Sequence, residues 1–198
     1  MEEIQQAIRI LQDGGIVIFP TDTAFGIGCR MDNEVAVKRL FAIRKRPETK
    51  AVPVLVASLQ MAQAYLQPIS SEVIDKLITP FWPGGLTIVL AAQEEKVPAL
   101  VRGGTATLGV RMPDHPTTLA LINGIGIPIV GTSANFSDEA TPYTFESLNK
   151  ELIKKVDFVV SGDCYGHQAS TVIDCTVKPW KILRQGKIAV NSEVRGEK

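Results

Sequence analysis

The side chains that could bind an anionic ligand gather in short stretches beside apolar runs of this sequence. Each stretch combines hydroxyl, glycine or cationic residues, and such groups at strand ends often line a ligand crevice in open α/β sheets. Taken singly, most are better explained as turns, helix caps or solvated loops. Together they predict one sheet whose strand ends converge on a negatively charged ligand. The stretches are 20–26, 44–50, 106–113, 131–135, and 170–174 with 183–186.

The stretch 44–50 is strongly basic. It holds two arginines and two lysines with a single glutamate, a composition that suits phosphate groups. A solvated surface loop is the alternative interpretation, and Pro47 favours a preset loop because it stiffens the chain. The 21 basic and 21 acidic residues of the whole chain cancel, so a phosphate site must be a local patch.

Alternation over residues 106–111 predicts a strand with two different faces. The even positions are apolar and form a face that packs, whereas Thr107, Gly109 and Arg111 share the other face. A hydroxyl, a bare backbone and a guanidinium suit an anion, because the planar fork of arginine matches a carboxylate or a phosphate. A structural ion pair of Arg111 at the strand end is the alternative.

Several signatures of other protein classes are absent. The sequence has no Walker phosphate loop, no dinucleotide fingerprint after a strand and no Gly-x-Ser-x-Gly elbow. Its two histidines and three cysteines lack the spacing of a metal site, so no metal ligand is predicted. The N-terminus is acidic and no apolar run reaches the length of a membrane span. Free cysteines then indicate a cytoplasmic protein.

Strands and helices mix along the chain without strict βαβ order. This pattern predicts a single α/β domain with a mixed sheet over 1–190 and a polar tail at 191–198. Apolar runs predict strands at 16–19, 51–57, 86–92, 106–111, 127–130, 156–160, 170–177 and 180–183. Helices are predicted at 4–11, after Asp32 or Asn33, after Ser58, after Ser70 or Ser71, at 116–122 and from Thr144 to Ile153.

In their order, the five stretches resemble the YrdC-like family of threonylcarbamoyl-AMP synthases. The matching segments cover nearly the whole chain, from about residue 14 to 188. The resemblance implies a single twisted α/β domain with flanking helices and an open, positively lined concavity. The segments are PTDTAFGIG, RKRPETKAVPVLVA, FWPGGLTIVL, TLGVRMPDHP, PIVGTSANFS, STVID and ILRQGKI.

The resemblance also implies an activity. Members of the family are nucleotidyltransferases that make threonylcarbamoyl-AMP and pyrophosphate from L-threonine, bicarbonate and ATP, for the threonylcarbamoyl modification of tRNA adenosine. No catalytic side chain is expected, because such a transfer needs mainly positioning and charge stabilisation. Mg²⁺ is expected with ATP. The tRNA threonylcarbamoyl transferase machinery is the expected downstream partner, tRNA itself is a partner that the basic residues permit, and no membrane is expected.

The resemblance assigns site residues by matching positions. The family's usual tyrosine in the first motif is Phe25 here, which removes a hydroxyl and keeps the ring. Ser133-Ala134-Asn135 is retained, which favours the synthase branch over the related YciO-like proteins. The L-threonine-binding positions are Thr23, Arg111, Gly131 and Ser170. The ATP-binding positions are Arg44, Arg46, Lys50, Thr107, Ser133, Asn135, Thr141 and Arg184.

A non-catalytic RNA- or tRNA-binding module is the alternative function. It would use the same basic concavity, with 44–50 as its main contact. Against it stand the neutral net charge and the 6% content of aromatic residues, because base stacking needs aromatic platforms.

Overall fold

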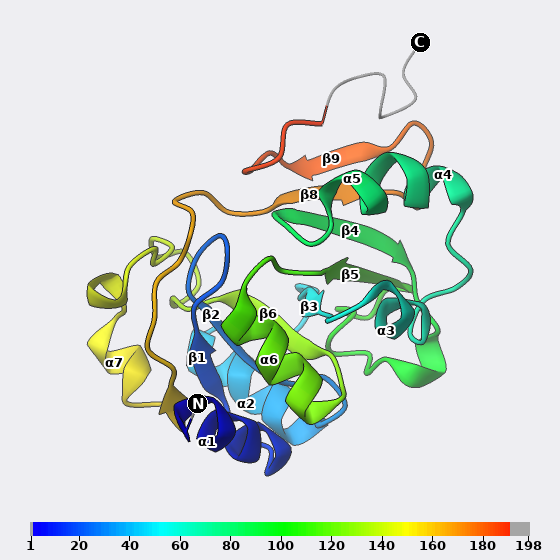
Figure 1. Ribbon diagram of the computed structural model, residues 1–198. Helices are drawn as coiled ribbons and strands as arrows, with labels where there is room; N and C mark the ends of the chain where they lie inside the picture. Colours follow the sequence, from blue (N-terminus) through cyan, green and yellow to red (C-terminus); the bar gives the residue numbers. More distant parts are fainter. Residues whose placement is uncertain (1, 191–198) are drawn as a thin grey trace.

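A mixed sheet of nine strands is the scaffold of this molecule (Figure 1). The computed structural model describes residues 2–190, and the strand count refers to that part of the chain. The strand order is β7-β1-β2-β6-β3-β5-β4-β8-β9. The strands are β1 (Val17–Phe19), β2 (Gly26–Arg30), β3 (Val54–Leu55), β4 (Leu86–Ala91), β5 (Thr107–Arg111), β6 (Ile129–Ser133), β7 (Phe158–Val159), β8 (Thr171–Asp174) and β9 (Lys181–Arg184).

Strands that are far apart in the sequence lie beside one another in the sheet. β3 pairs in parallel with β5, β4 in parallel with β8, and β1 in parallel with β7. The other pairs are antiparallel. This pairing confirms the predicted α/β fold with a mixed sheet. It also places the stretches 20–26, 106–113, 131–135 and 170–174 on neighbouring or nearly neighbouring strands.

Helices cover both faces of the sheet. Val17 and Phe19 of β1 pack with α1 and α6, which lie side by side in Figure 1. Ile16 and Ile18 point to the other face and join the cluster that contains α2, because successive strand residues alternate between faces. The α-helices are α1 (Glu2–Gln12), α2 (Glu34–Arg44), α3 (Leu59–Gln63), α4 (Ser71–Val73), α5 (Thr79–Phe81), α6 (Pro116–Ile125) and α7 (Lys150–Ile153). A π-helical segment η1 (Ile74–Ile78) joins α4 to α5, and η2 (Glu94–Lys96) and η3 (Phe145–Ser147) are short 3₁₀-helices.

Local sequence explains where α2 begins and ends. Asn33 caps its start, with the side-chain oxygen accepting from the amide of Ala36 at 3.0 Å. Lys45 ends it in the left-handed conformation, with φ 53°. Arg44 is therefore the last helical residue, and its side chain lies at the helix end that faces β6.

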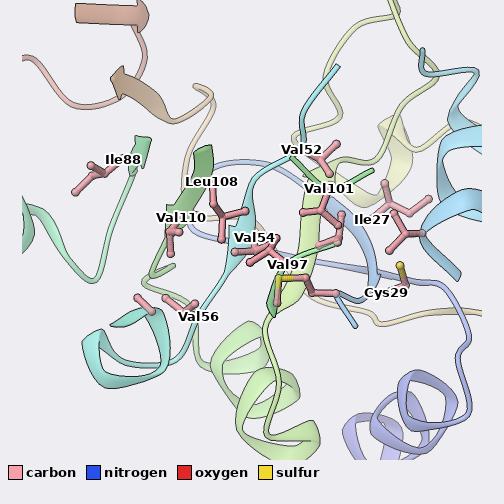
Figure 2. Packing of buried hydrophobic residues seen from close by; sticks show 14 of the residues in the cluster. Ile27, Cys29, Val52, Val54, Val56, Ile88, Val97, Val101, Leu108 and Val110 are labelled. Atoms are coloured by element: carbon pink, nitrogen blue, oxygen red, sulfur yellow. The ribbon is translucent and has the colours of Figure 1, made fainter. Parts of the chain in front are cut away.

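The centre of the sheet is filled by aliphatic side chains of β3, β5 and their neighbours (Figure 2). Val54, Leu108 and Val110 are each 1% exposed, and Figure 2 shows them lying together across the two strands. The predicted apolar face of 106–111 is thus confirmed at Leu108 and Val110, whereas Ala106 lies before the strand and is exposed. Burying that face turns Arg111 toward the opposite face, where polar groups can meet it.

Three features differ from the sequence prediction. β2 was not predicted, because its sequence Gly-Ile-Gly-Cys-Arg carries neither apolar alternation nor a continuous apolar run. Only Val54–Leu55 of the predicted strand 51–57 pairs in the sheet. The predicted helix 144–153 is divided, since a capping box between Thr144 and Ser147 closes η3 and Asn149 then caps α7 anew.

The remaining general expectations concern the chain end, the cysteines and the membrane. The polar tail at 191–198 lies outside the described residues. All three cysteines are free, and of these only Cys29 is fully buried. Among residues 2–190, no helix combines the length and the apolarity needed to cross a bilayer. The cytoplasmic location stays a prediction.

Candidate active site

A cavity of about 210 Å³ lies where β2, β6, β5, β4 and β8 approach the end of α2. Its lining comes from each of the five stretches that the sequence singled out. Seven of the lining residues carry hydroxyl groups and four are arginines. Within the described part of the chain the lining contains no aspartate or glutamate. Such a surface can offer many hydrogen-bond donors to an anion and no repelling carboxylate.

Most of the predicted site residues line this cavity. On the L-threonine side they are Thr23, Arg111, Gly131 and Ser170. On the ATP side they are Arg44, Arg46, Ser133, Thr141 and Arg184. The structure therefore brings together residues that are up to 161 positions apart in the sequence, from Thr23 to Arg184. Their roles as ligand contacts stay predictions.

Three predicted ATP-side residues do not line the cavity. Lys50 is exposed and does not line the cavity, although Arg46, which does, donates to the backbone carbonyls of Lys50 and Ala51. Thr107 lies four residues before Arg111 on β5, which is about 13 Å along a strand. Its hydroxyl instead contacts that of Thr105 at 3.0 Å.

Asn135, the third of these residues, is buried behind the cavity and holds Arg44. Its side-chain oxygen and its carbonyl both accept from the Arg44 guanidinium, at 3.1 and 2.9 Å. Its amide nitrogen donates to the carbonyl of Glu139 at 2.7 Å, which fixes the orientation of the side chain. The structure thus gives Asn135 a supporting contact with Arg44.

Arg44 is the most elaborately held cation of the cavity. It is 3% exposed, and besides Asn135 it donates to Thr132 Oγ1 at 2.6 Å and to Ser133 Oγ at 3.5 Å. Burial lowers its pKa to about 10, and the positive charge of Arg46 adds to this effect. Arg44 nevertheless stays charged at neutral pH, so the cavity keeps a rigid cation at the end of α2.

Arg111 is the arginine that β5 contributes to the cavity. Its Nε donates to the carbonyl of Gly84 at 3.0 Å and its Nη1 to Thr23 Oγ1 at 2.8 Å. Its Nη2 donates to Asp22, and the two form a buried ion pair. The structural ion pair that the sequence left as an alternative for Arg111 is therefore present. Arg111 lines the cavity as well.

The four cavity arginines differ in how their charge is balanced. Arg111 has Asp22, whereas Arg44, Arg46 and Arg184 form no salt bridge with any residue from 2 to 190. Burial lowers the pKa of each of these three guanidinium groups. Their charged forms would be stabilised by a bound anion, since a nearby opposite charge favours the ionised group. The cavity thus has one arginine whose charge a carboxylate balances and three without such a partner among the described residues, and of these Arg184 lies close enough to Arg111 for its charge to lower the pKa of Arg111.

Sequence reasoning left out two residues that contribute to the site. Asp22 was quoted in the first motif without a role, although a carboxylate beside a predicted anion site is itself a signal. Thr87 is a hydroxyl residue within the apolar strand β4, and its Oγ1 lies 2.9 Å from Ser170 Oγ. Ser170 Oγ also accepts from Arg184 at 2.9 Å, so Thr87 belongs to the contacts that hold Arg184.

Two lining residues act in ways that their types alone do not reveal. A side chain at Gly131 would begin 2.4 Å from Leu55, so the missing Cβ makes room for Leu55. Only the backbone of Gly131 is therefore available to a ligand. Phe25 is fully buried and meets the ring of Phe145 edge-on, with ring centroids 6.1 Å apart. The apolar ring that replaces the family's tyrosine thus has an aromatic partner of its own.

His115 lies near Asp22 and predicts a pH dependence of stability. It is buried, stacks on Tyr165 and contacts the carbonyl of Asp163, while its Nδ1 has no partner among the described residues. Burial lowers its pKa below the ordinary 6.5, although Asp22 and Asp114 oppose the shift. The unfolded chain then binds more protons than the native one just below pH 6.5, so stability falls there.

The measurement is the free energy of unfolding in urea between pH 7.5 and 5.5. We expect it to decrease as the pH falls through about 6.5 in the wild type and to be flatter in His115→Gln. The paired carboxylates of Asp32 and Asp157 titrate lower, since their arginine partners lower their pKa values below 3.8. Equal slopes in the two proteins would exclude His115 as the cause.

Within residues 2–190, no three histidine, cysteine, aspartate or glutamate side chains gather so that they could hold a metal ion. A cation at the cavity would therefore need ligands from a bound substrate. Phosphate oxygens are the usual ligands of Mg²⁺ in nucleotide sites, together with water.

Comparisons with known proteins show to which family this chain belongs. The family model Sua5_yciO_yrdC, described as "Telomere recombination", matches residues 9–186. A threonylcarbamoyl-AMP synthase of Vibrio vulnificus is 34% identical over 189 residues, which covers 94% of this chain and 100% of the relative. A synthase of Bacillus subtilis is also 34% identical, and 54% of its length is covered.

Two solved structures show the same fold. Pyrococcus abyssi Sua5 complexed with L-threonine superposes with a TM-score of 0.87 at 35% identity, over 92% of this chain and 54% of that chain. Escherichia coli YciO superposes with a TM-score of 0.83 at 28% identity, over 92% and 88% of the two chains. The family model spans nearly nine-tenths of this chain, and the Vibrio relative and the two solved structures each span more than nine-tenths of it. This chain belongs to the Sua5/YciO/YrdC family.

Proposed function

We propose that this protein is an L-threonylcarbamoyladenylate synthase. It would make threonylcarbamoyl-AMP and pyrophosphate from L-threonine, bicarbonate and ATP. The synthase name of its Vibrio relative, which it matches over its full length, supports the activity, as does the L-threonine complex of the Pyrococcus neighbour. A non-catalytic RNA-binding module is not favoured, because these relatives are named as enzymes.

The observation that carries the proposal is the division of charge in the cavity. Threonine is a zwitterion without net charge, whereas ATP carries about four negative charges at neutral pH, since its phosphate groups are ionised. The neutralised pair of Arg111 and Asp22 suits the amino acid. The three unpaired cations Arg44, Arg46 and Arg184 suit the triphosphate. One cavity therefore has a place for each reactant beside the other.

The reaction needs positioning more than it needs a reactive side chain. The threonine amine attacks the carbon of bicarbonate and a water molecule leaves, which gives a carbamate. A carbamate oxygen then attacks the α-phosphorus of ATP. A new P–O bond forms as the bond to the leaving pyrophosphate breaks. Holding the carbamate beside the α-phosphate makes the attack effectively intramolecular. The unpaired arginines would stabilise the charge that develops on the phosphate oxygens.

We propose that Mg²⁺ enters with ATP and binds its phosphate oxygens. The hydroxyl oxygens of the cavity, such as those of Thr141 and Ser133, are neutral ligand atoms of the kind that Mg²⁺ accepts beside phosphate oxygens. The product would be consumed by the tRNA threonylcarbamoyl transferase machinery. Direct contact with tRNA is a further proposal that the basic residues around Arg46 support.

The experiment that tests the function measures pyrophosphate release from MgATP. We expect release that requires both L-threonine and bicarbonate, with serine and valine much poorer substrates. Release that is independent of the amino acid would contradict the proposal. Salt-sensitive RNA binding without turnover would instead support the RNA-binding module.

Replacing Arg46 with alanine is expected to weaken ATP binding roughly 10-fold or more, because a hydrogen bond to a charged group contributes about 1.5–3 kcal/mol. Calorimetry with ATP provides the measurement. Arg39→Ala is the matched control, since Arg39 lies on α2 and pairs with Asp157 away from the cavity. An unchanged ATP affinity in Arg46→Ala would remove Arg46 from the site.

A further inference from the structure

Tyr143 and His167 join two loops that both contribute to the lining of the cavity. Their ring centroids lie 6.0 Å apart and the ring planes meet at 66°, which is an edge-to-face contact. Thr141, two residues before Tyr143, lines the cavity, and so does Ala169, two residues after His167. Neither ring itself belongs to the lining, so this aromatic pair lies beside the cavity, where the two loops meet.

The backbone of both loops is held in place, whereas the two rings keep free surface. The carbonyl of Pro142 accepts from the amide of Phe25 at 3.0 Å, which ties the first loop to the start of β2. A side chain at Gly166 would begin 2.8 Å from the carbonyl of Asp22, so the second loop lies directly on the stretch 20–26. The tyrosine ring is half-buried and the histidine ring is exposed. The pair is therefore positioned in advance and still open to a further flat partner.

Within residues 2–190, the lining of the cavity offers no free aromatic surface of its own. Phe25 is the one aromatic residue in the lining, and it is fully buried with its ring against that of Phe145. The hydroxyls and arginines of the lining suit phosphates and an amino acid. The base of a nucleotide binds best to a flat ring on which it can stack. Such a ring has to come from beside the cavity.

Arg184 connects the aromatic pair with the charged part of the cavity. Its Nε and Nη2 donate to the carbonyl and the hydroxyl of Ser170, at 3.0 and 2.9 Å. Burial lowers the pKa of Arg184, and Tyr143 opposes this shift because its hydroxyl oxygen lies near enough for its charge to act. Burial also lowers the pKa of Arg111, and the charge of Arg184 adds to that effect. Arg184 is thus within electrostatic reach of both Tyr143 and Arg111.

The order of the groups along ATP brings the base to this side of Arg184. In the proposed reaction the carbamate on threonine attacks the α-phosphorus, so the α-phosphate must lie beside the threonine, near Arg111 and Arg184. The β- and γ-phosphates then extend toward the other two unpaired cations, Arg44 and Arg46. The ribose and the base leave the α-phosphate in a direction away from those two phosphates. Tyr143, which lies near Arg184, is an aromatic ring that the base can then reach.

We propose that the base of the nucleotide stacks on the ring of Tyr143. The inference rests on the proposed function for the identity of the nucleotide. Stacking uses the face of a base, so it tolerates different bases but distinguishes a nucleotide from a bare polyphosphate. Tyr143 is then a binding residue for the base, separate from the cations that bind the phosphates.

The test compares the binding of MgATP with that of inorganic triphosphate, which carries the charged groups without ribose or base. Calorimetry measures both affinities in the wild type, in Tyr143→Leu and in Tyr143→Phe. We expect Tyr143→Leu to bind ATP roughly 5- to 150-fold more weakly and to bind triphosphate as tightly as the wild type. Tyr143→Phe keeps the ring and should retain the affinity for ATP. Tyr165→Leu is the matched control and should leave both affinities unchanged, because Tyr165 is also exposed and packs on a histidine, His115, away from Arg184.

Equal losses for ATP and triphosphate in Tyr143→Leu would overturn the inference, because Tyr143 would then act only on the phosphates, through Arg184. An unchanged affinity for ATP, or a loss in Tyr143→Phe as large as in Tyr143→Leu, would also overturn it. A measurement on the wild type covers the case in which Tyr143→Leu does not fold. We expect nuclear Overhauser contacts between the base protons of ATP and the ring of Tyr143, and their absence would contradict the stacking. Failure of the proposed function is seen separately, as wild-type protein that binds ATP and releases no pyrophosphate when threonine and bicarbonate are added.

Discussion

Replacing Arg111 with alanine is expected to weaken the use of threonine by roughly 10- to 150-fold, because a hydrogen bond to a charged group contributes about 1.5–3 kcal/mol. The apparent affinity for threonine in the pyrophosphate assay measures the effect. The same change leaves Asp22 as a buried unpaired charge, which costs about 3–5 kcal/mol of stability. The assay must therefore run well below the unfolding midpoint of the variant.

Arg111→Lys separates the two effects. Lysine keeps a positive charge beside Asp22 and so preserves most of the fold, but it lacks the fork that would meet a carboxylate while still reaching Gly84 and Thr23. We expect a protein of nearly normal stability with a clearly weaker affinity for threonine and an unchanged affinity for ATP. If either variant kept the wild-type affinity for threonine, Arg111 would not be its carboxylate partner.

Arg44→Lys is expected to weaken ATP binding by roughly 10- to 100-fold, although it preserves the charge. The guanidinium contacts Thr132, Ser133 and Asn135 at once, and a lysine ammonium cannot span the three. The cation would lose its fixed position at the end of α2, so a triphosphate would have to order it on binding.

Calorimetry with ATP measures this loss, and the melting temperature without ligand reports any general damage. Arg39→Lys offers a control on the same helix, because Arg39 pairs with Asp157 at the surface. An Arg44→Lys protein that bound ATP as tightly as the wild type would show that the geometry of Arg44 is irrelevant to the nucleotide.

Alternation made the placement of Arg111 predictable. Leu108 and Val110 are buried on one face of β5, and this forces Arg111 onto the other. Thr107 shares that face, yet a shared face says nothing of the distance along the strand. The partner of Arg111 could not be predicted in the same way, since Asp22 lies 89 positions earlier and only strand pairing brings it close.

β2 shows why glycine-rich strands escape sequence patterns. A side chain at Gly28 would begin 2.1 Å from the carbonyl of Val130 on β6, so the strand is glycine there because its neighbour lies too close. This requirement belongs to the pair of strands and cannot be seen in either alone. The stretch 44–50 is similar, because its composition does not tell that Arg44 and Arg46 line the cavity and Lys50 does not.

The family resemblance and the residue patterns contributed different parts of the site. Residue types and their order predicted that separate stretches converge, and the cavity draws on each of them. The difference between the paired Arg111 and the unpaired Arg44, Arg46 and Arg184 depends on which arginine meets a carboxylate. Which arginine meets a carboxylate is a property of the three-dimensional contacts. The proposal that threonine and ATP bind side by side in this cavity depends on it.

The most direct test of this account is mass spectrometry of the product formed from ATP, L-threonine and ¹³C-bicarbonate. The account predicts threonylcarbamoyl-AMP carrying one ¹³C atom, formed together with pyrophosphate. At substrate concentrations that do not saturate the variants, much less of it is expected from Arg111→Ala and Arg44→Lys, and an unchanged amount from Arg39→Lys. A folded wild-type protein that binds both ligands and yields only unreacted ATP, or AMP without the labelled carbon, would contradict it.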